Sequence, residues 1–80
     1  MERIPVQSSN LKSVGYDERS QTLEVEFLNG GIYQYTRVPK YVYEELMRVD
    51  KKGTYFSRNV RNNLYYGCVK VYPEYKMLRI

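Results

Sequence analysis

The residues best suited to chemistry in this sequence are basic and aromatic, and they gather between positions 51 and 65. Lysine and arginine side chains neutralise phosphates, and an exposed tyrosine ring can stack on an unpaired base. A solvated helix face explains the same residues, because outward Lys and Arg at i, i+3 spacing are ordinary. Both explanations stay open for the five candidate nucleic-acid-binding residues: Lys51, Lys52, Arg58, Arg61 and Tyr65.

The charge of the chain is unevenly distributed. Residues 1–50 hold six Lys/Arg against eight Asp/Glu, whereas residues 51–80 hold seven against one, so the net charges are −2 and +6. Such asymmetry is a recognised hint of an anionic partner for the basic part. It agrees with the position of the candidate residues without identifying the partner.

Catalytic chemistry has little support in this sequence. It contains no histidine, so the commonest general base near neutral pH and the commonest metal ligand are both missing. The adjacent pair Glu44-Glu45 projects in different directions from a predicted helix, and Glu24 and Glu26 lie on a predicted exposed strand face. Asn29-Gly30-Gly31 lacks the Gly-Lys-Ser/Thr of a phosphate loop. We expect a protein that is not an enzyme and that binds no metal and no cofactor.

The length and the cysteine content predict one small domain in a reducing compartment. Eighty residues are enough for a single small core, and the one cysteine, Cys68, cannot form an internal disulfide. The N-terminus lacks a basic segment followed by an apolar run, and no stretch approaches the roughly 20 apolar residues of a membrane span. We expect a cytoplasmic protein that does not contact a membrane.

A β-hairpin between positions 23 and 38 is the clearest element that could organise this domain. Residues 23–27 alternate apolar and acidic side chains, which is the period of a half-buried strand. Asn29-Gly30-Gly31 supplies residues that tolerate a positive φ, so the chain can reverse there. The second arm, which ends in Tyr33-Gln34-Tyr35, is also expected to be a strand.

The register of this hairpin decides which way its two tyrosines point. A two-residue loop would put an amide on the core face. A three-residue loop, residues 29–31, pairs Phe27 with Tyr33 and Val25 with Tyr35 and keeps the apolar face intact. We therefore expect Tyr33 and Tyr35 to pack in the core, in preference to stacking on bases from an open sheet face.

The flanks of the hairpin complete a short meander. Residues 12–16 predict a first strand, and the polar residues 17–20 predict the turn that follows it. Residues 1–7 are expected to be a flexible N-terminus, because Pro5 interrupts regular pairing.

Two helices follow the hairpin. Val38-Pro39 predicts the start of the first, whose apolar residues 42, 43, 46 and 47 recur at helical spacing, with Glu44 and Arg48 as an outward pair. Lys51-Lys52-Gly53 predicts its end, and Thr54 is the expected cap of a second helix that Gly67 closes. The second helix is expected to bury Phe56, Val60 and Leu64 and to expose Arg58, Arg61 and Tyr65 on the opposite side.

The predicted fold is therefore α+β: a three-stranded antiparallel β-meander packed by two α-helices. Residues 68–72 could add a short C-terminal strand before Pro73. The basic and apolar tail, residues 74–80, could pair with a sheet edge, dock on a partner or remain loose.

The order and spacing of several short motifs resemble those of the KTSC domain family, over about residues 8–66. These motifs are Gly15-Tyr16, residues 23–27, Gly30-Gly31, Ile32-Tyr33-Gln34-Tyr35, Val38-Pro39, Tyr43, Lys52-Gly53 and residues 55–61. Tyr33 and Tyr35 match the family's central Tyr-x-Tyr. The chain departs from the family at Leu64-Tyr65-Tyr66-Gly67 and in residues 67–80, which we interpret as a C-terminal extension.

The family occurs at the C-terminus of some lysyl-tRNA synthetases and as small free-standing bacterial proteins. The resemblance implies a compact domain without a defined activity, for which RNA binding has been proposed. We therefore expect a small non-catalytic binding module that associates with RNA, either tRNA or another structured RNA, through a basic second helix. The alternative is a protein-interaction adaptor that uses the tyrosine-rich surface and the C-terminal extension.

Overall fold

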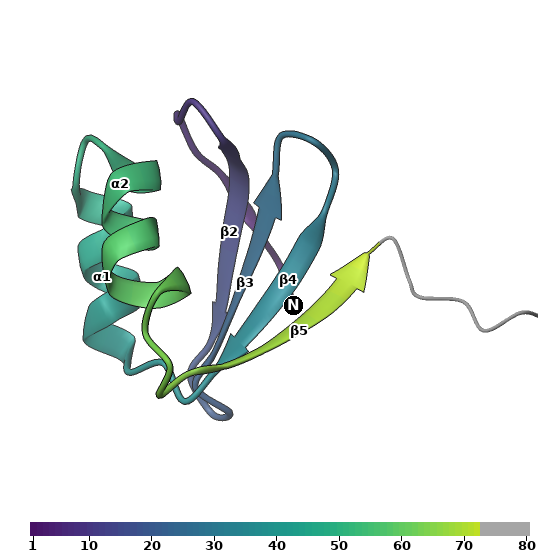
Figure 1. Ribbon diagram of the computed structural model, residues 1–80, viewed down its shortest axis with the longest axis vertical. Coiled ribbons are helices and arrows are strands. Elements are labelled where there is room, and N and C mark those ends of the chain that lie inside the picture. Colours follow the sequence, from purple (N-terminus) through teal and green to yellow (C-terminus); the bar gives the residue numbers. More distant parts are fainter. Residues whose placement is uncertain (73–80) are drawn as a thin grey trace, which may run out of the picture.

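The computed structural model describes residues 1–72, which form a five-stranded antiparallel sheet with helices on one face (Figure 1). The strands lie side by side in chain order: β1 (Ile4–Pro5), β2 (Leu11–Asp17), β3 (Thr22–Phe27), β4 (Ile32–Thr36) and β5 (Gly67–Tyr72). Between β4 and β5 come α1 (Lys40–Arg48), α2 (Lys52–Phe56) and the π-helical turn η1 (Ser57–Arg61). The predicted α+β class with two helices is confirmed, but the sheet has five strands and not three. Residues 74–80, for which edge pairing, docking on a partner and a loose tail were all left open, lie outside the described residues.

The N-terminus is part of the sheet, so the prediction of a flexible segment at residues 1–7 was wrong. Ile4 pairs with Val14 and Pro5 with Ser13 in the β1–β2 ladder. Proline is tolerated there because β1 is an edge strand. Gly15 permits the close approach of this segment: a Cβ at that position would lie 2.5 Å from the Glu2 carbonyl oxygen.

The β3–β4 hairpin has the predicted loop length but begins one residue earlier. Val25 pairs with Tyr33 and Leu23 with Tyr35, so the predicted pairing is displaced by two residues. Gly30 takes the left-handed conformation, with φ of 97°, and the Phe27 N–H donates to the Gly31 carbonyl at 2.8 Å. The sheet faces were still predicted correctly, because a two-residue displacement returns every side chain to the same face.

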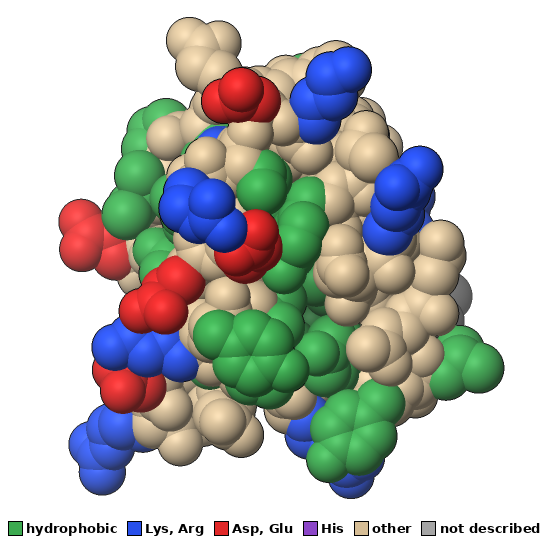
Figure 2. Space-filling view, turned by 90° about the vertical axis from the view of Figure 1, so that its left-hand side faces the viewer, with side chains coloured by type: hydrophobic (Ala, Val, Ile, Leu, Met, Phe, Trp, Pro, Cys, Tyr) green, Lys and Arg blue, Asp and Glu red, His purple; other side chains and the backbone are tan. Residues whose placement is uncertain are grey.

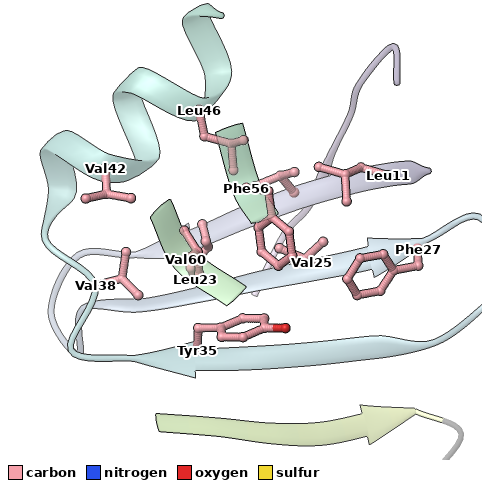
Figure 3. Packing of buried hydrophobic residues seen from close by; sticks show 11 residues of the cluster. Leu11, Leu23, Val25, Phe27, Tyr35, Val38, Val42, Leu46, Phe56 and Val60 are labelled. Carbon is pink, nitrogen blue, oxygen red and sulfur yellow. The ribbon is translucent and has the colours of Figure 1, made fainter. Parts of the chain in front are cut away.

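The core lies between the sheet and the helices, and Phe56 of α2 is at its centre (Figure 3). Its ring meets Phe27 and Tyr35 edge to face, at centroid distances of 5.7 and 5.3 Å. Leu64 was predicted to join this core, but it is 97% exposed. It lies beyond Arg61, where the helix ends. The buried apolar residues are Leu11, Val14, Leu23, Val25, Phe27, Tyr35, Val38, Val42, Leu46, Phe56 and Val60.

The first helix agrees closely with its prediction. Pro39 caps α1, which buries Val42 and Leu46. Arg48, however, forms its ion pair with Glu45 three residues earlier and not with Glu44 as expected. Within residues 1–72, no helix has both the length and the apolar character needed to cross a membrane.

The second helix is shorter than predicted and changes geometry at its midpoint. Thr54 lies inside α2 and does not cap it, because the helix begins at Lys52 after Lys51. At η1 the Asn62 N–H donates to the Ser57 carbonyl at 3.2 Å, which is the i→i+5 bond of a π-helix. Gly67 starts β5 and does not close a helix, while the predicted strand at residues 68–72 is confirmed.

Candidate nucleic-acid interface

The five predicted contact residues do not form a single surface. Lys51, Lys52 and Arg58 line one open hollow, Arg61 lines a second, and Tyr65 lies in neither lining. The two hollows share Ser9 and Asn10, so they adjoin each other along the loop that precedes β2. We call the two together the basic groove.

The first hollow, of about 580 Å³, is lined by cations and hydroxyl groups. Lys51 and Arg58 are exposed at its rim, and Ser8, Thr54 and Ser57 contribute hydroxyls. Asp50 is the one acidic residue in its lining. This combination suits a phosphate, which takes charge-assisted hydrogen bonds from guanidinium and ammonium groups and ordinary ones from hydroxyls.

Lys52 lines the same hollow but already has protein partners. Its Nζ donates to the Val49 carbonyl at 2.7 Å and to the Met47 carbonyl at 3.0 Å. These carbonyls belong to the C-terminal end of α1, where a cation also interacts favourably with the helix dipole. Lys52 therefore fastens α2 to α1 and is less available to a ligand than Lys51.

The loop at residues 8–10 is held in place by its own hydrogen bonds. The Ser8 Oγ accepts from the backbone N–H groups of Asn10 and Leu11 at 3.3 and 3.2 Å. The Asn10 side chain lies against Gly53, where a Cβ would be 2.3 Å from the Asn10 Oδ1. Gly53 thus allows the loop to lie directly against α2, and it shapes the wall that the two hollows share.

The second hollow, of about 370 Å³, has an aromatic wall and one cation. The Arg61 guanidinium carbon lies 5.6 Å from the Phe27 ring centroid, in cation–π geometry. Tyr33 meets Phe27 edge to face at 5.6 Å. Arg61 was predicted to point away from Phe56, but it contacts the core aromatic residue Phe27.

The π-helical turn explains the direction of Arg61. In an α-helix each residue turns by about 100°, whereas the wider i→i+5 turn of η1 rotates each residue by less. Arg61 follows Phe56 by five residues, so the wider turn brings it back toward the side of the helix that faces the sheet. π-Helical turns of this kind occur frequently at functional sites.

Tyr65 forms a separate cluster with Arg37. The Arg37 guanidinium carbon lies 5.6 Å from the Tyr65 ring centroid, and Tyr65 is 66% exposed. Arg37 has φ of 67°, a conformation that is uncommon for a residue with a side chain. Tyr65 also meets Tyr66 edge to face at 5.9 Å.

The two motif tyrosines have different surroundings. Tyr35 is buried against Phe56, and burial, together with a hydrogen bond to Cys68, raises the pKa of its hydroxyl. Tyr33 is half-buried and lines the second hollow. The structure thus places Tyr35 inside the core and Tyr33 at its edge.

The outer face of the sheet was predicted to expose Glu24 and Glu26, but it carries a closed polar network. Arg3 reaches across β2 to form an ion pair with Glu24, whose side chain is 8% exposed. Burial alone would raise the pKa of Glu24, but hydrogen bonds from Gln34 and Arg3 and the charge of Arg3 outweigh it and lower that pKa. The Ser13 hydroxyl donates to Glu26 at 2.8 Å.

Several lining residues were missed by sequence reasoning. Ser8, Ser9 and Asn10 were given no role from the sequence, and Asn29 was interpreted only as a turn residue. A polar run that includes two small hydroxyl residues, placed before a strand, was the one available signal. Its contact with Gly53 depends on long-range packing that no local pattern encodes.

Among residues 1–72, no group of three or more His, Cys, Asp or Glu side chains could hold a metal ion.

The fold and the groove define a small α+β domain with an open, basic and hydroxyl-rich groove. The KTSC domain family matches residues 7–65, which is most of the chain, and the chain belongs to that family. The predicted resemblance over residues 8–66 is confirmed.

Relatives of this chain occur both as small proteins and as parts of large ones. A protein of Stutzerimonas stutzeri is 45% identical over 58 residues, which cover 72% of this chain and 82% of that protein. A lysine–tRNA ligase of Nostoc punctiforme is 34% identical over 55 residues, covering 69% of this chain but only 10% of the ligase.

A solved structure has the same fold. The crystal structure of a KTSC domain protein from Yersinia pestis superposes with a TM-score of 0.82 at 34% identity, covering 88% of this chain and 96% of that one.

Proposed function

We propose that this chain is a small non-catalytic module that binds RNA through its basic groove. The observation that carries the proposal is the pairing state of the groove's cations. Among residues 1–72, Lys51, Arg58 and Arg61 form no ion pair with an acidic side chain, whereas Arg3, Lys12, Lys40 and Arg48 all do. The cations outside the groove that also lack an acidic partner among these residues, Arg19, Arg37 and Lys70, line neither hollow. Unpaired cations beside hydroxyl groups are suited to phosphate oxygens, whose neutralisation releases counterions.

The distribution of acidic and basic side chains on the surface supports the same proposal. Figure 2 shows acidic and basic side chains interleaved on the left of the helix-covered side, while the charged side chains along its right-hand edge are basic. Basic side chains without acidic neighbours raise the local concentration of a polyanion and speed its association.

We propose a non-catalytic module because of the pKa and the ion pairs of its carboxylates. Catalytic acids near neutral pH need a raised pKa, but the pKa of the buried carboxylate Glu24 is lowered and its oxygens are held by Arg3 and Gln34. Glu45, the partner of Arg48, forms a helix-surface ion pair.

The relatives suggest which RNA to test first. Lysine–tRNA ligases carry a segment similar to this chain, and their name states that they act on tRNA. A family relationship does not transfer function by itself, so tRNA is a starting probe, to be compared with an unrelated RNA.

The test is fluorescence anisotropy with labelled tRNA and with an unstructured RNA of similar length at low salt. The variant is Lys51→Ala/Arg58→Ala, and the matched control is Lys12→Ala/Lys40→Ala, which removes the same charge from residues that have acidic partners. We expect the groove variant to lose most of the affinity and the control to lose little. Affinity that is absent at low salt, or equal losses in both variants, would contradict the proposal.

The exposed edge strand supports a second function, that of a protein-interaction adaptor. All six residues of β5 are exposed, with Val69 at 59% and Tyr72 at 55%, and β5 ends the sheet. Such an edge can accept a strand from a partner protein. A pull-down whose captured partner is lost with Val69→Thr/Tyr72→Thr, but kept with Lys51→Ala/Arg58→Ala, would favour this function over RNA binding.

A further inference from the structure

The second hollow differs chemically from the first, although both belong to the basic groove. Its wall is aromatic, since Phe27 and Tyr33 meet there edge to face, and its cation Arg61 makes a cation–π contact with Phe27. Phosphate needs no aromatic wall. A planar, π-rich ligand does, because base–aromatic and base–guanidinium stacking are the usual ways in which proteins hold an unpaired base.

Arg61 remains accessible while it stacks. Its guanidinium carbon lies 5.6 Å from the centroid of the Phe27 ring, and the residue as a whole is exposed. A planar group can therefore reach the guanidinium from the solvent side, while the cation–π contact restricts the positions that the guanidinium takes. A lysine at this position would keep the charge but would lose the plane.

Two amides provide hydrogen bonds at the rim of the same hollow. Asn10 and Asn29 both line it, and both are exposed. The Asn29 Oδ1 accepts from the Gly31 N–H at 2.9 Å, and this bond orients the side chain. Among the described residues neither side-chain NH₂ donates to a protein acceptor. Carbonyl and ring-nitrogen acceptors on the edge of a nucleobase would suit these donors.

The two hollows lie in the right order for one nucleotide and its phosphate. They share Ser9 and Asn10, with Lys51 and Arg58 on one side and Arg61 with Tyr33 on the other. Lys70 pairs with Tyr33 across the β4–β5 ladder, so it lies on the same face as that ring and can meet a further phosphate.

From this arrangement we infer that the second hollow binds one unpaired nucleobase, stacked on Arg61 and Tyr33, while the first hollow binds the adjoining phosphate. The inference rests on the proposed function and narrows it: the ligand is a single-stranded segment of RNA. A base inside a duplex cannot enter such a hollow without leaving its stack.

The direct test is an NMR titration of the full chain with three probes: inorganic phosphate, adenosine, and adenosine 5′-monophosphate. We expect phosphate to shift the Thr54 and Ser57 amide signals without moving the ring signals of Tyr33. Adenosine 5′-monophosphate should shift the Thr54 and Ser57 amide signals, the Tyr33 ring signals and the side-chain amide signals of Asn10 and Asn29. Adenosine should shift only the Tyr33 ring signals and the side-chain amide signals of Asn10 and Asn29. A nucleotide that shifts the phosphate hollow alone would overturn the inference.

Arg61→Lys supplies an independent readout, because it separates stacking from charge. For an unstructured RNA we expect about a fivefold or greater loss of affinity with an unchanged dependence on salt concentration. Arg58→Lys is the matched control, for which a small loss is expected because a phosphate accepts either cation. A thermal melt of each variant checks that the fold is intact.

The outcomes separate this inference from the proposed function. If RNA affinity depends on Lys51 and Arg58 but Arg61→Lys has no effect, the module binds RNA by phosphate contacts only and the nucleobase site is wrong. A duplex that competes as well as a single strand of the same sequence leads to the same conclusion. If no RNA binds and no probe shifts the hollows, both proposals fail.

Discussion

The two charged regions of this small domain differ in whether their charges are paired. On the outer face of the sheet, Arg3 binds Glu24 and lies 3.7 Å from Glu26, and the Gln34 amide donates to Glu24 at 2.7 Å. In the basic groove, Lys51, Arg58 and Arg61 have no acidic partner among residues 1–72. The charges on the outer face are paired with one another, whereas these three cations of the groove are not paired with acidic side chains.

This difference separates charges that stabilise the fold from charges that are available to a ligand. A buried carboxylate costs free energy unless it is paired, so the outer network is needed for folding. Exposed cations without partners contribute little to stability. Mutations in the two regions should therefore affect different measurements.

Arg3→Ala should give the largest effect on stability. Without Arg3, the Glu24 carboxylate keeps Gln34 as its remaining side-chain donor, although the Glu24 side chain is only 8% exposed. We expect the free energy of unfolding to fall by about 1–3 kcal/mol, measured by urea denaturation. Lys12→Ala is the control, because Lys12 is 61% exposed and 3.8 Å from Glu26, and it should change stability by less than about 0.5 kcal/mol. Equal effects of the two variants would show that the outer network is not closed.

The pH dependence of stability gives a second view of the same network. The pKa of Glu24 is lowered in the folded state from its ordinary value of 4.5. Its contribution is therefore fully present above pH 4.5 and is lost as the pH falls through the lower folded-state pKa. The stability difference between wild type and Arg3→Ala should shrink in that acidic window, because protonated Glu24 no longer needs a cation. A difference that grows on acidification would contradict the assignment.

Gly53→Ala should weaken RNA binding without destabilising the fold. The new Cβ would displace the Asn10 side chain, whose Oδ1 would otherwise be 2.3 Å away. We expect a loss of about two- to tenfold in affinity for unstructured RNA. Alanine gains up to about 1 kcal/mol over glycine in a helix, so the melting temperature should not fall. Unchanged affinity would show that the position of Asn10 is unimportant.

The smallest expected effect on stability is that of Lys51→Ala/Arg58→Ala. Both residues are exposed and have no acidic partner among the described residues. The free energy of unfolding should change by no more than about 0.5 kcal/mol, measured by the urea denaturation used for Arg3→Ala. A loss comparable to that of Arg3→Ala would mean that the groove also serves the fold.

Sequence reasoning succeeded where one local pattern determined the outcome. The alternation of residues 23–27 and the spacing of Val42 and Leu46 give the correct buried faces, because these faces depend only on strand and helix period. The α+β class follows from those two periods. The strand at residues 68–72 was marked by its β-branched residues and by Pro73.

Sequence reasoning failed where contacts between distant parts of the chain determine the structure. The pairing of Ile4 with Val14 depends on an edge left open by β2, and the burial of Glu24 depends on Arg3 reaching across that strand. The π-helical turn redirects Arg61, which no helical periodicity could anticipate. Of the candidate residues, Lys51, Lys52 and Arg58 therefore share one hollow, whereas Arg61 and Tyr65 lie apart from them.

The salt dependence of RNA affinity tests the central claim most directly, because it counts phosphate contacts. If the unpaired cations of the groove bind phosphates, removing Lys51 and Arg58 should reduce the slope of log affinity against log salt concentration by about 1.4, which is roughly 0.7 for each contact to a single strand. The control Lys12→Ala/Lys40→Ala, whose lysines have acidic partners, should leave the slope unchanged. An unchanged slope in the groove variant, or an equal decrease in the control, would contradict the account.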